Sequence, residues 1–464
     1  MSVKLKFLGG VRTVTGSSHL IQTGRSEILI DAGIFYGRRD EFYEVNTSFS
    51  YNPKKLNAVL LSHAHIDHSG NIPSLIKRGL RCKIYATSAT KDLCELMLAD
   101  SGKVQKEDIR YVNKINRRLG IPLRKPLYSE REGYKATRRF RSISYGQRFN
   151  VTKDSTATFY DAGHILGSAV IKLEINNGSR PIRLGYAADL GRRNLPLLNN
   201  PTALAGLDYL ILESTYGGKL HAPIEQAKAK LCEAINQTQE SKGKIIIPSF
   251  ALERTQEVIF YLAQLLEEKK IPPIPIYLDS PLASDITDVF NLHVDYFNPV
   301  ARQAIKNDCN PFKLLNLRYI RSQADSKSLN NDKRPMVIIA GSGMCESGRI
   351  LHHLKNNIED SRNTILVVGF MAKDTLGRKI VEGERIVRIF GVEYELNAQV
   401  IVINSFSGHA DRNALSEYVK SCLPLKRIFL VHGDEDQSKA LLDALCAEGL
   451  NAYLPVKHEE VELA

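Results

Sequence analysis

The sequence lacks several features that would assign the protein to a class at once. No apolar run approaches the roughly 18–20 residues of a membrane-spanning helix, although 43% of the residues are hydrophobic. The N-terminal residues alternate between apolar and charged side chains, as a strand does, and show no secretory signal pattern. We therefore expect no membrane partner, and the 464 residues suffice for two or three globular domains.

Cysteine is scarce and scattered. The seven cysteines include no CxxC pair, and none is close to the histidine-rich stretch described below. A scattered, odd number of cysteines is typical of reduced thiols in a cytoplasm and argues against a disulfide framework. We expect a cytoplasmic protein whose metal sites, if it has any, use histidine and carboxylate ligands.

Acidic residues are scarce in one segment. Between Lys103 and Arg148 the chain has fourteen lysines and arginines but only four acids, a net charge of +10. The rest of the chain contributes only +2 to the total of +12. A polyanion is the natural partner of such a segment, although a basic run can also be the solvated face of a helix.

Four side chains with metal-ligand chemistry lie within six residues, directly after an apolar run. The run at 56–61 predicts a buried strand, and a helix is expected from about residue 71, where Pro73 suits the first turn. The loop between them is a common place for chemistry in layered α/β folds. Imidazole and carboxylate groups bind zinc, and two metals about 3.5–4 Å apart can clamp a phosphodiester. The four side chains are His63, His65, Asp67 and His68.

Further histidines and carboxylates follow other predicted strands. Each would be unremarkable alone, since an acid at a strand end is often a turn residue. They are Asp31, His164, Asp189, Glu213, His409 and His432. His164 follows a strand within the region 149–175, and the other five follow or end strands predicted at 27–31, 182–186, 207–213, 398–404 and 428–431. His19, in contrast, is expected to be a core histidine.

Between about 214 and 395 the predicted strands alternate with helices, which is the βαβ pattern of a parallel sheet. The polar segment 321–334 is predicted to be a loop. Two turns that follow strands can present backbone N–H groups to phosphate. Their candidate residues are Ser249, Gly341, Ser342 and Gly343.

This ordered set of motifs resembles the metallo-β-lactamase fold and its β-CASP nuclease branch. Residues 63–68 are similar to the HxHxDH motif of the fold, and Glu213, His409 and His432 are similar to motifs A, B and C of the branch. The resemblance covers nearly the whole chain. It implies an αββα sandwich at 1–213 and 396–464, interrupted by an α/β β-CASP domain at 214–395, with the active site in the cleft between the domains.

The resemblance also implies two zinc ions per chain. The ligands of one would be His63, His65 and His164, those of the other Asp67, His68 and His432, and Asp189 would bridge both. Asp31 would support the metal-binding loop from the second shell of residues.

The remaining roles follow from the same resemblance. Asp67, Glu213 and His409 would be catalytic. His409 would protonate the leaving oxygen, and Glu213 would orient His409. Ser407 and Gly408 would bind substrate phosphate together with the two turns at 249 and 341–343. The turn at 217–221 departs from the usual pattern of the branch, so its role is open.

The predicted function is zinc-dependent, endonucleolytic hydrolysis of single-stranded RNA. RNA-directed members of the branch carry histidine at motif C, whereas DNA-directed members carry valine, and His432 therefore favours RNA. Three alternatives stay open: a 5′ exoribonuclease of the same family, a small-molecule (thio)ester hydrolase of the same metal fold, and a non-catalytic RNA-binding scaffold. The sequence also leaves a homo-oligomer open.

Overall fold

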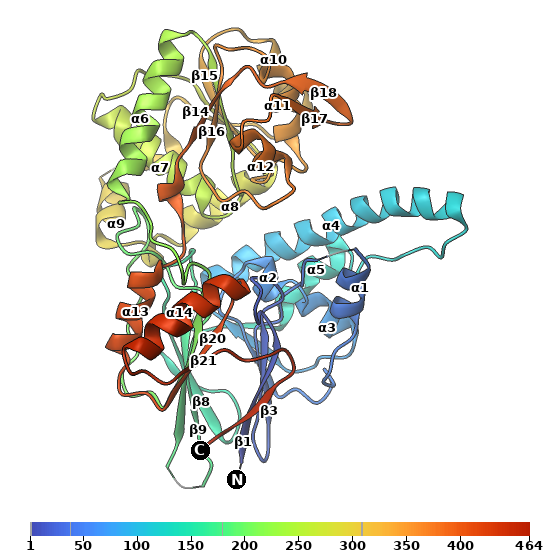
Figure 1. The fold of residues 1–464 in the computed structure, drawn as a ribbon, viewed down its shortest axis with the longest axis vertical. Helices are drawn as coiled ribbons and strands as arrows, with labels where there is room; N and C mark the ends of the chain where they lie inside the picture. The colour runs from blue at the N-terminus through green and yellow to red at the C-terminus, as the bar shows by residue number, and fades with distance from the viewer. Residues whose placement is uncertain (1, 38, 179, 308–309) are drawn as a thin grey trace. The chain divides into compact units, whose positions relative to one another are not determined.

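A computed structural model describes residues 2–37, 39–178, 180–307 and 310–464. The chain forms two compact units (Figure 1). The first unit comprises Met1–Arg193, Asn199–Leu220 and His409–Ala464, and the second comprises Asn194–Leu198 and His221–Gly408.

The first unit contains two seven-stranded sheets. One has the order β22-β1-β2-β3-β4-β5-β6, with strands β1 (Val3–Gly9), β2 (Ser18–Gln22), β3 (Glu27–Ile30), β4 (Ala58–Leu60), β5 (Lys83–Ala86), β6 (Phe140–Ser142) and β22 (Glu460–Leu463). The other has the order β21-β20-β11-β10-β9-β8-β7, with strands β7 (Arg148–Asn150), β8 (Ser155–Asp161), β9 (Ala169–Ile175), β10 (Ile182–Ala187), β11 (Tyr209–Glu213), β20 (Arg427–Val431) and β21 (Ala452–Tyr453).

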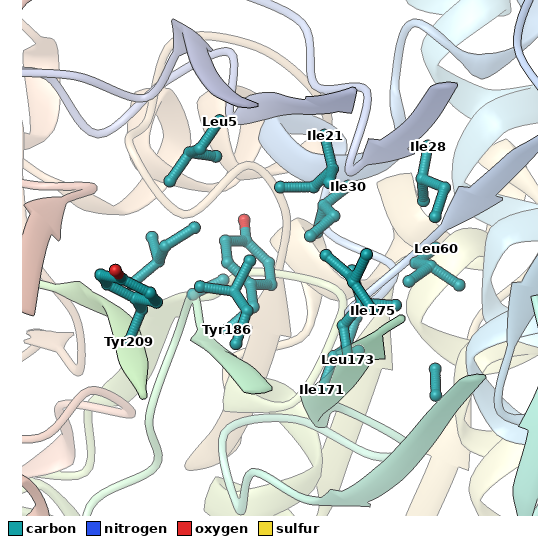
Figure 2. Close-up of a cluster of buried hydrophobic side chains, with 14 of the residues drawn as sticks. Leu5, Ile21, Ile28, Ile30, Leu60, Ile171, Leu173, Ile175, Tyr186 and Tyr209 are labelled. Atoms are coloured by element: carbon teal, nitrogen blue, oxygen red, sulfur yellow. The ribbon is translucent and has the colours of Figure 1, made fainter. Parts of the chain in front are cut away.

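The two sheets face each other across one apolar core (Figure 2). The transfer of each fully buried aliphatic or aromatic side chain from water to this core stabilises the folded state by about 1.5–3 kcal/mol. The labelled core residues come from both sheets: Leu5, Ile21, Ile28, Ile30 and Leu60 from the first, and Ile171, Leu173, Ile175, Tyr186 and Tyr209 from the second. His19 is completely buried between Phe7 and Tyr186, as expected for a core histidine.

Helices cover the outer faces of both sheets, which confirms the predicted αββα sandwich (Figure 1). On the side of the β1 sheet lie α1 (Arg39–Thr47), α2 (Ile66–Ser69), α3 (Ile72–Lys77), α4 (Ser88–Leu119) and α5 (Glu130–Ala136), and on the other side lie α13 (Arg412–Ser421) and α14 (Glu435–Ala447).

Parallel pairing gathers the loops that carry polar side chains. Strands β3, β4 and β5 run parallel in the first sheet, and β10, β11 and β20 run parallel in the second. Their carboxyl ends therefore lie at one edge of each sheet, where the chain continues into the histidine-rich loop, Asp189 and His432. This is the edge at which layered α/β folds bind ligands.

The second unit is built on a six-stranded parallel sheet, as the βαβ pattern predicted. Its order is β14-β13-β15-β12-β16-β19, with strands β12 (Lys244–Pro248), β13 (Ile276–Asp279), β14 (Leu317–Tyr319), β15 (Met336–Ala340), β16 (Thr364–Val367) and β19 (Gln399–Val402). A hairpin of β17 (Ile386–Ile389) and β18 (Val392–Glu395) is separate. The helices are α6 (Glu225–Glu240), α7 (Arg254–Glu267), α8 (Pro281–Leu292), α9 (Pro299–Lys306), α10 (Gln323–Asn331), α11 (Arg349–Asn357) and α12 (Leu376–Val381).

Two expectations need correction. The polar segment 321–334 is not a loop, because α10 occupies most of it; Ser322 caps this helix by accepting the N–H of Asp325, and Leu329 is buried. The second unit also extends beyond residue 395, since β19 pairs with β16, and the chain rejoins the first unit at His409.

No helix in the described part of the chain is long and apolar enough to cross a membrane. The six cysteines among the described residues are free thiols, and Cys309 lies outside those residues.

Candidate metal centre

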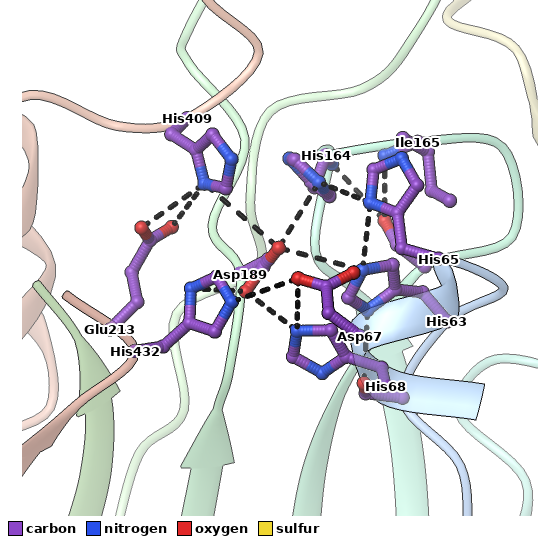
Figure 3. A network of polar contacts seen from close by, with 12 residues as sticks. His63, His65, Asp67, His68, His164, Ile165, Asp189, Glu213, His409 and His432 are labelled. Carbon is purple, nitrogen blue, oxygen red and sulfur yellow. Dashed lines mark hydrogen bonds and ion pairs between the residues drawn. The ribbon is translucent and has the colours of Figure 1, made fainter. Parts of the chain in front are cut away.

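The first histidine cluster is assembled from three segments of the first unit. His63 and His65 follow β4, His164 follows β8, and Asp189 follows β10. Nε2 of His63 lies 3.1 Å from Nδ1 of His65, which lies 3.3 Å from Nε2 of His164. Oδ2 of Asp189 lies 3.4 Å from Nε2 of His63 and 3.3 Å from Nε2 of His164 (Figure 3).

These distances fit a tetrahedral metal. Zinc–nitrogen and zinc–oxygen bonds of about 2.0–2.2 Å place neighbouring tetrahedral ligand atoms roughly 3.3–3.5 Å apart. The four measured separations of 3.1–3.4 Å are close to that spacing, and three imidazoles with one carboxylate are a zinc-type donor set. Burial lowers the pKa of His63 well below its usual range and that of His65 to about 4. Both imidazoles are therefore neutral at pH 7, the form that binds metal.

The second cluster contains Asp67, His68 and His432 and shares Asp189 with the first. Oδ1 of Asp189 lies 3.4 Å from Nε2 of His68 and 3.2 Å from Nδ1 of His432. Oδ2 of Asp67 lies 3.3 Å from Nε2 of His432 and 3.8 Å from Nε2 of His68. Within the described residues, the buried Nε2 of His68 and Oδ1 of Asp189 have no hydrogen-bond partner.

A metal would satisfy both of these orphaned atoms, so the second cluster also fits one. Asp189 turns one oxygen to each cluster, which is the arrangement of a bridging carboxylate (Figure 3). Burial by itself would lower the pKa of His68, but Asp189, Asp67 and Asp31 outweigh it and raise that pKa well above its usual range. A metal bound here would have to displace the proton of His68.

Asp31 orients His68 from behind. It lies at the end of β3 with a φ of 56°, and its Oδ2 lies 2.7 Å from Nδ1 of His68. The same oxygen accepts hydrogen bonds from the hydroxyls of Ser62 and Tyr186, each at 2.7 Å, and Oδ1 accepts the N–H of Ser62 at 2.8 Å. Such partners fix the ring that holds a metal.

Three members of this supporting shell were missed by sequence reasoning: Ser62, Tyr186 and Thr215. Tyr186 lies on an apolar strand, and its buried hydroxyl carries no sequence signal. Thr215 donates its hydroxyl to the carbonyl oxygen of His432 at 2.9 Å and lies 3.2 Å from Nδ1 of the same residue.

His409 and Glu213 form a third group beside the bridging aspartate. Nδ1 of His409 lies 3.2 Å from Oε2 of Glu213 and 4.0 Å from Oδ2 of Asp189 (Figure 3). Glu213 is completely buried and accepts the backbone N–H of Leu190. Burial alone would lower the pKa of His409, but Glu213, Asp189 and Asp67 raise it to about 9. His409 is thus protonated at neutral pH and can donate a proton.

The predicted phosphate-binding residues belong to the second unit. Ser249 follows β12 and donates its N–H to the carbonyl oxygen of Ala340. Gly341–Gly343 follow β15, where Ser342 donates its N–H to Ser347 and accepts the N–H groups of Glu346 and Ser347 on its hydroxyl. Ser407 and Gly408 immediately precede His409 in the chain.

Three domain families match segments of the chain. They are the Metallo-beta-lactamase superfamily over residues 11–113, the Beta-Casp domain over 255–380, and the Zn-dependent metallo-hydrolase RNA specificity domain over 393–455. A solved structure of a protein of unknown function from Enterococcus faecalis V583 has the same fold, with a TM-score of 0.58, 12% identity and full coverage of both chains.

Curated relatives match almost the whole length of this chain. Ribonuclease TTHA0252 of Thermus thermophilus is 35% identical, with 96% of each chain covered. The RNase J-like protein of Methanocaldococcus jannaschii is 30% identical, with 94% of each chain covered. Transcription termination factor FttA of Pyrococcus abyssi is 31% identical over 99% of this chain and 71% of its own length. This chain therefore belongs to the β-CASP family of the metallo-β-lactamase superfamily.

Proposed function

We propose that the protein is a cytoplasmic ribonuclease that uses two zinc ions to hydrolyse single-stranded RNA at internal phosphodiester bonds. The observation that carries the proposal is Asp189, whose two oxygens face two separate ligand clusters while His409 stands beside them. The names of two relatives, Ribonuclease TTHA0252 and RNase J-like protein, and the match to an RNA specificity domain support RNA as the substrate.

The ligand assignment follows the clusters. His63, His65 and His164 would hold one zinc, Asp67, His68 and His432 the other, and Asp189 both. When bound, the two ions polarise a phosphate and lower the pKa of water. Asp67 is the more exposed carboxylate, with 26% of its side chain accessible against 1% for Asp189. It would accept a hydrogen bond from the incoming water and help to orient it.

The chain itself supplies the proton for the leaving oxygen. Glu213 holds Nδ1 of His409, and Nε2 of the same ring would deliver the proton to the leaving oxygen. The buried carboxylate keeps the imidazolium form populated, as a general acid requires. Since an RNA leaving group is a poor one, this proton transfer contributes to the rate of cleavage.

The second unit would bind substrate phosphates. Ser249 and Gly341–Gly343 lie at the carboxyl ends of adjacent parallel strands, the usual ligand edge of such a sheet. With Ser407 and Gly408 they form the proposed phosphate-binding set.

The decisive experiment compares circular and 5′-labelled linear single-stranded RNA. An endonuclease cuts both, whereas a 5′ exoribonuclease leaves the circle intact. Cleavage should stop with a chelator and return with zinc, and elemental analysis should find two zinc ions per chain. Thioester hydrolysis without RNA cleavage would reject the proposal in favour of the small-molecule alternative, and RNA binding without any cleavage would favour the scaffold.

A further inference from the structure

Helix α4 links the metal centre to the basic segment. Its 32 residues give a length of about 48 Å at 1.5 Å per residue. The N-terminal part packs against α2, which carries Asp67 and His68. Thr87 and Thr90 at its start donate their hydroxyls to the carbonyl oxygen of Gly167, three residues after His164. The second half reaches past α1, α3 and α5 (Figure 1).

One face of this outer half is covered by the segment that returns from the helix end. Ile109, Val112 and Asn116 are buried there. Asn113 exchanges two hydrogen bonds of 2.9 Å with the backbone of Arg124, and Asn116 donates to the carbonyl oxygen of Pro122. The return segment is therefore fixed against the helix.

A second face is a basic stripe, defined by residues spaced three or four apart along the helix. All five side chains of the stripe are exposed: Lys103, Lys106, Arg110, Lys114 and Arg117. Within the described part of the chain, Lys106, Arg110, Lys114 and Arg117 have no carboxylate within ion-pair distance. Three residues of the stripe and two of the return segment line a hollow of about 440 Å³: Lys106, Arg110, Arg117, Arg124 and Lys125.

Unpaired like charges in a row repel one another and destabilise a helix. Residues 103–125 carry eight lysines and arginines against two acids, so the surface is complementary to a polyanion. The stripe from 103 to 117 spans about 21 Å, room for several phosphates of an extended strand. Tyr111, 65% exposed and one turn before Lys114, offers a ring on which a base can stack.

We propose that the basic stripe of α4, with Arg124 and Lys125, binds the phosphate backbone of single-stranded RNA that extends from the metal centre. This inference rests on the proposed ribonuclease function and adds a binding surface remote from the cleavage site. Val104, Tyr111, Ile115 and Leu119 form an exposed apolar stripe next to the basic one, which would instead suit a protein partner. Charge complementarity favours RNA.

The test replaces three charges of the stripe by Arg110→Gln, Lys114→Gln and Arg117→Gln. Glutamine keeps the helix propensity and most of the side-chain length. The matched control is Lys54→Gln, Lys55→Gln and Lys83→Gln; these exposed lysines lie at the amino ends of β4 and β5, opposite the edge that carries the metal loop. Both variants lose three charges from the first unit, and their zinc content and melting temperature should match those of the wild type.

Binding is measured by fluorescence anisotropy with a labelled single-stranded phosphorothioate RNA, which keeps the backbone charge and resists hydrolysis. Each lost phosphate contact should reduce the slope of log affinity against log salt by about 0.7, so the stripe variant should be shallower by about 2. The control should keep the wild-type slope. As a second readout, 4-thiouridine RNA should cross-link to peptides within residues 103–125 of the wild-type protein.

Equal slopes for the two triple variants, with no cross-link in this segment, would overturn the inference. Self-association that is lost in Ile115→Ser and Leu119→Ser, with unchanged RNA affinity, would overturn it in favour of a protein interface. Failure of the proposed function is a separate result, because it would appear as an absence of RNA cleavage by the wild-type protein.

Discussion

Asp189 is the residue on which both clusters depend. Its Oδ2 completes the first cluster and its Oδ1 faces the second, so one side chain fixes the separation of the two. It is almost completely buried, and a carboxylate is kept in such a place only where cationic groups compensate its lost hydration. Although burial opposes it, the histidines around Asp189 hold its pKa well below its usual range. Asp189 is therefore charged at neutral pH.

Asp67→Ala should remove one metal and leave the other. Oδ2 of Asp67 approaches His432 and His68 but belongs only to the second cluster. We expect about one zinc per chain by elemental analysis, a far-UV circular dichroism spectrum like that of the wild type, and loss of RNA cleavage. Full activity, or loss of both metals together, would contradict the assignment of Asp67 to a second site.

His409→Ala should slow RNA cleavage by roughly 10²–10⁴-fold, the usual contribution of a positioned general acid. Both metals should remain bound. The loss should be much smaller for bis(p-nitrophenyl) phosphate, because nitrophenolate departs without a proton. Exposed His352 on α11 supplies the control, since His352→Ala removes an imidazole that no cluster contains. A His409 variant that loses zinc, or that is equally impaired on both substrates, would show that His409 is not the proton donor.

At the residue scale the sequence predicted the side chains of the metal clusters, but it did not predict the hydroxyl groups that hold those side chains in place. The residues of the clusters could be found because each follows a strand and carries a metal-binding group. Ser62, Tyr186 and Thr215 could not, because a hydroxyl at such a position becomes meaningful only when the fold brings it to Asp31 or His432.

Among the elements of the second unit, β13, α10 and α11 are tied together by one buried carboxylate. Oδ2 of Asp279 accepts hydrogen bonds from Ser326 at 2.5 Å and from His353 at 2.6 Å, while Oδ1 accepts one from Arg349 at 2.5 Å. Burial alone would raise the pKa of Asp279, but these three donors lower it. The network explains how a polar segment such as 323–331 becomes a helix.

Asp279→Asn should destabilise the second unit by about 3 kcal/mol, because it leaves buried donors without their charged partner. Because the pKa of Asp279 is lower in the folded state than in the unfolded state, the carboxylate stabilises the fold at any pH above its unfolded pKa of about 4. This stabilisation is lost as the pH falls from there through the lower pKa of the folded state. In urea unfolding followed by circular dichroism, the free energy of unfolding of the wild type should therefore exceed that of Asp279→Asn by a large amount at pH 7. This difference should shrink below pH 4.

The control for this variant is Asp288→Asn, which weakens an exposed pair with Arg321. It should cost no more than about 1 kcal/mol. A similar loss in both variants, or a wild-type advantage that grows as the pH falls, would argue against the network.

The local sequence pattern predicted most helices and strands correctly. It failed where contacts between distant segments determine the secondary structure or the extent of a unit. The segment of α10 has no apolar periodicity, and its helix depends on the cap at Ser322 and on the bond from Ser326 to Asp279. The extent of the second unit was missed for a related reason. Strand β19 looks like any short apolar strand, and only its pairing with β16 assigns it to the second sheet.

The molecule as a whole consists of two units with separate cores. The first unit is discontinuous, since β20 and β22 come after the second unit in the chain and pair with β11 and β1. If residues 221–408 were a flexible loop, closing it would cost on the order of 5 kcal/mol. A folded second unit that holds its own ends together would reduce that cost.

The attachment points of the second unit suggest that the first can fold without it. The backbone N–H of Arg412 donates to the carbonyl oxygen of Lys219 at 3.0 Å, so the two sides of the insertion are adjacent within the first unit. A flexible linker of about six residues can therefore replace 221–408. Buried Leu195, Leu197 and Leu198 belong to the second unit and should be changed to serine, since they would otherwise be exposed.

This shortened protein should retain the zinc content of the full chain, because every residue of the three candidate metal groups belongs to the first unit. It should also hydrolyse bis(p-nitrophenyl) phosphate, which needs only the metal centre. Its cleavage of long RNA should fall, since the proposed phosphate-binding residues Ser249 and Gly341–Gly343 are gone. A shortened chain that is folded by circular dichroism but binds no zinc would show that the metal centre requires the second unit. RNA cleavage at the full rate would instead assign substrate binding to the first unit alone.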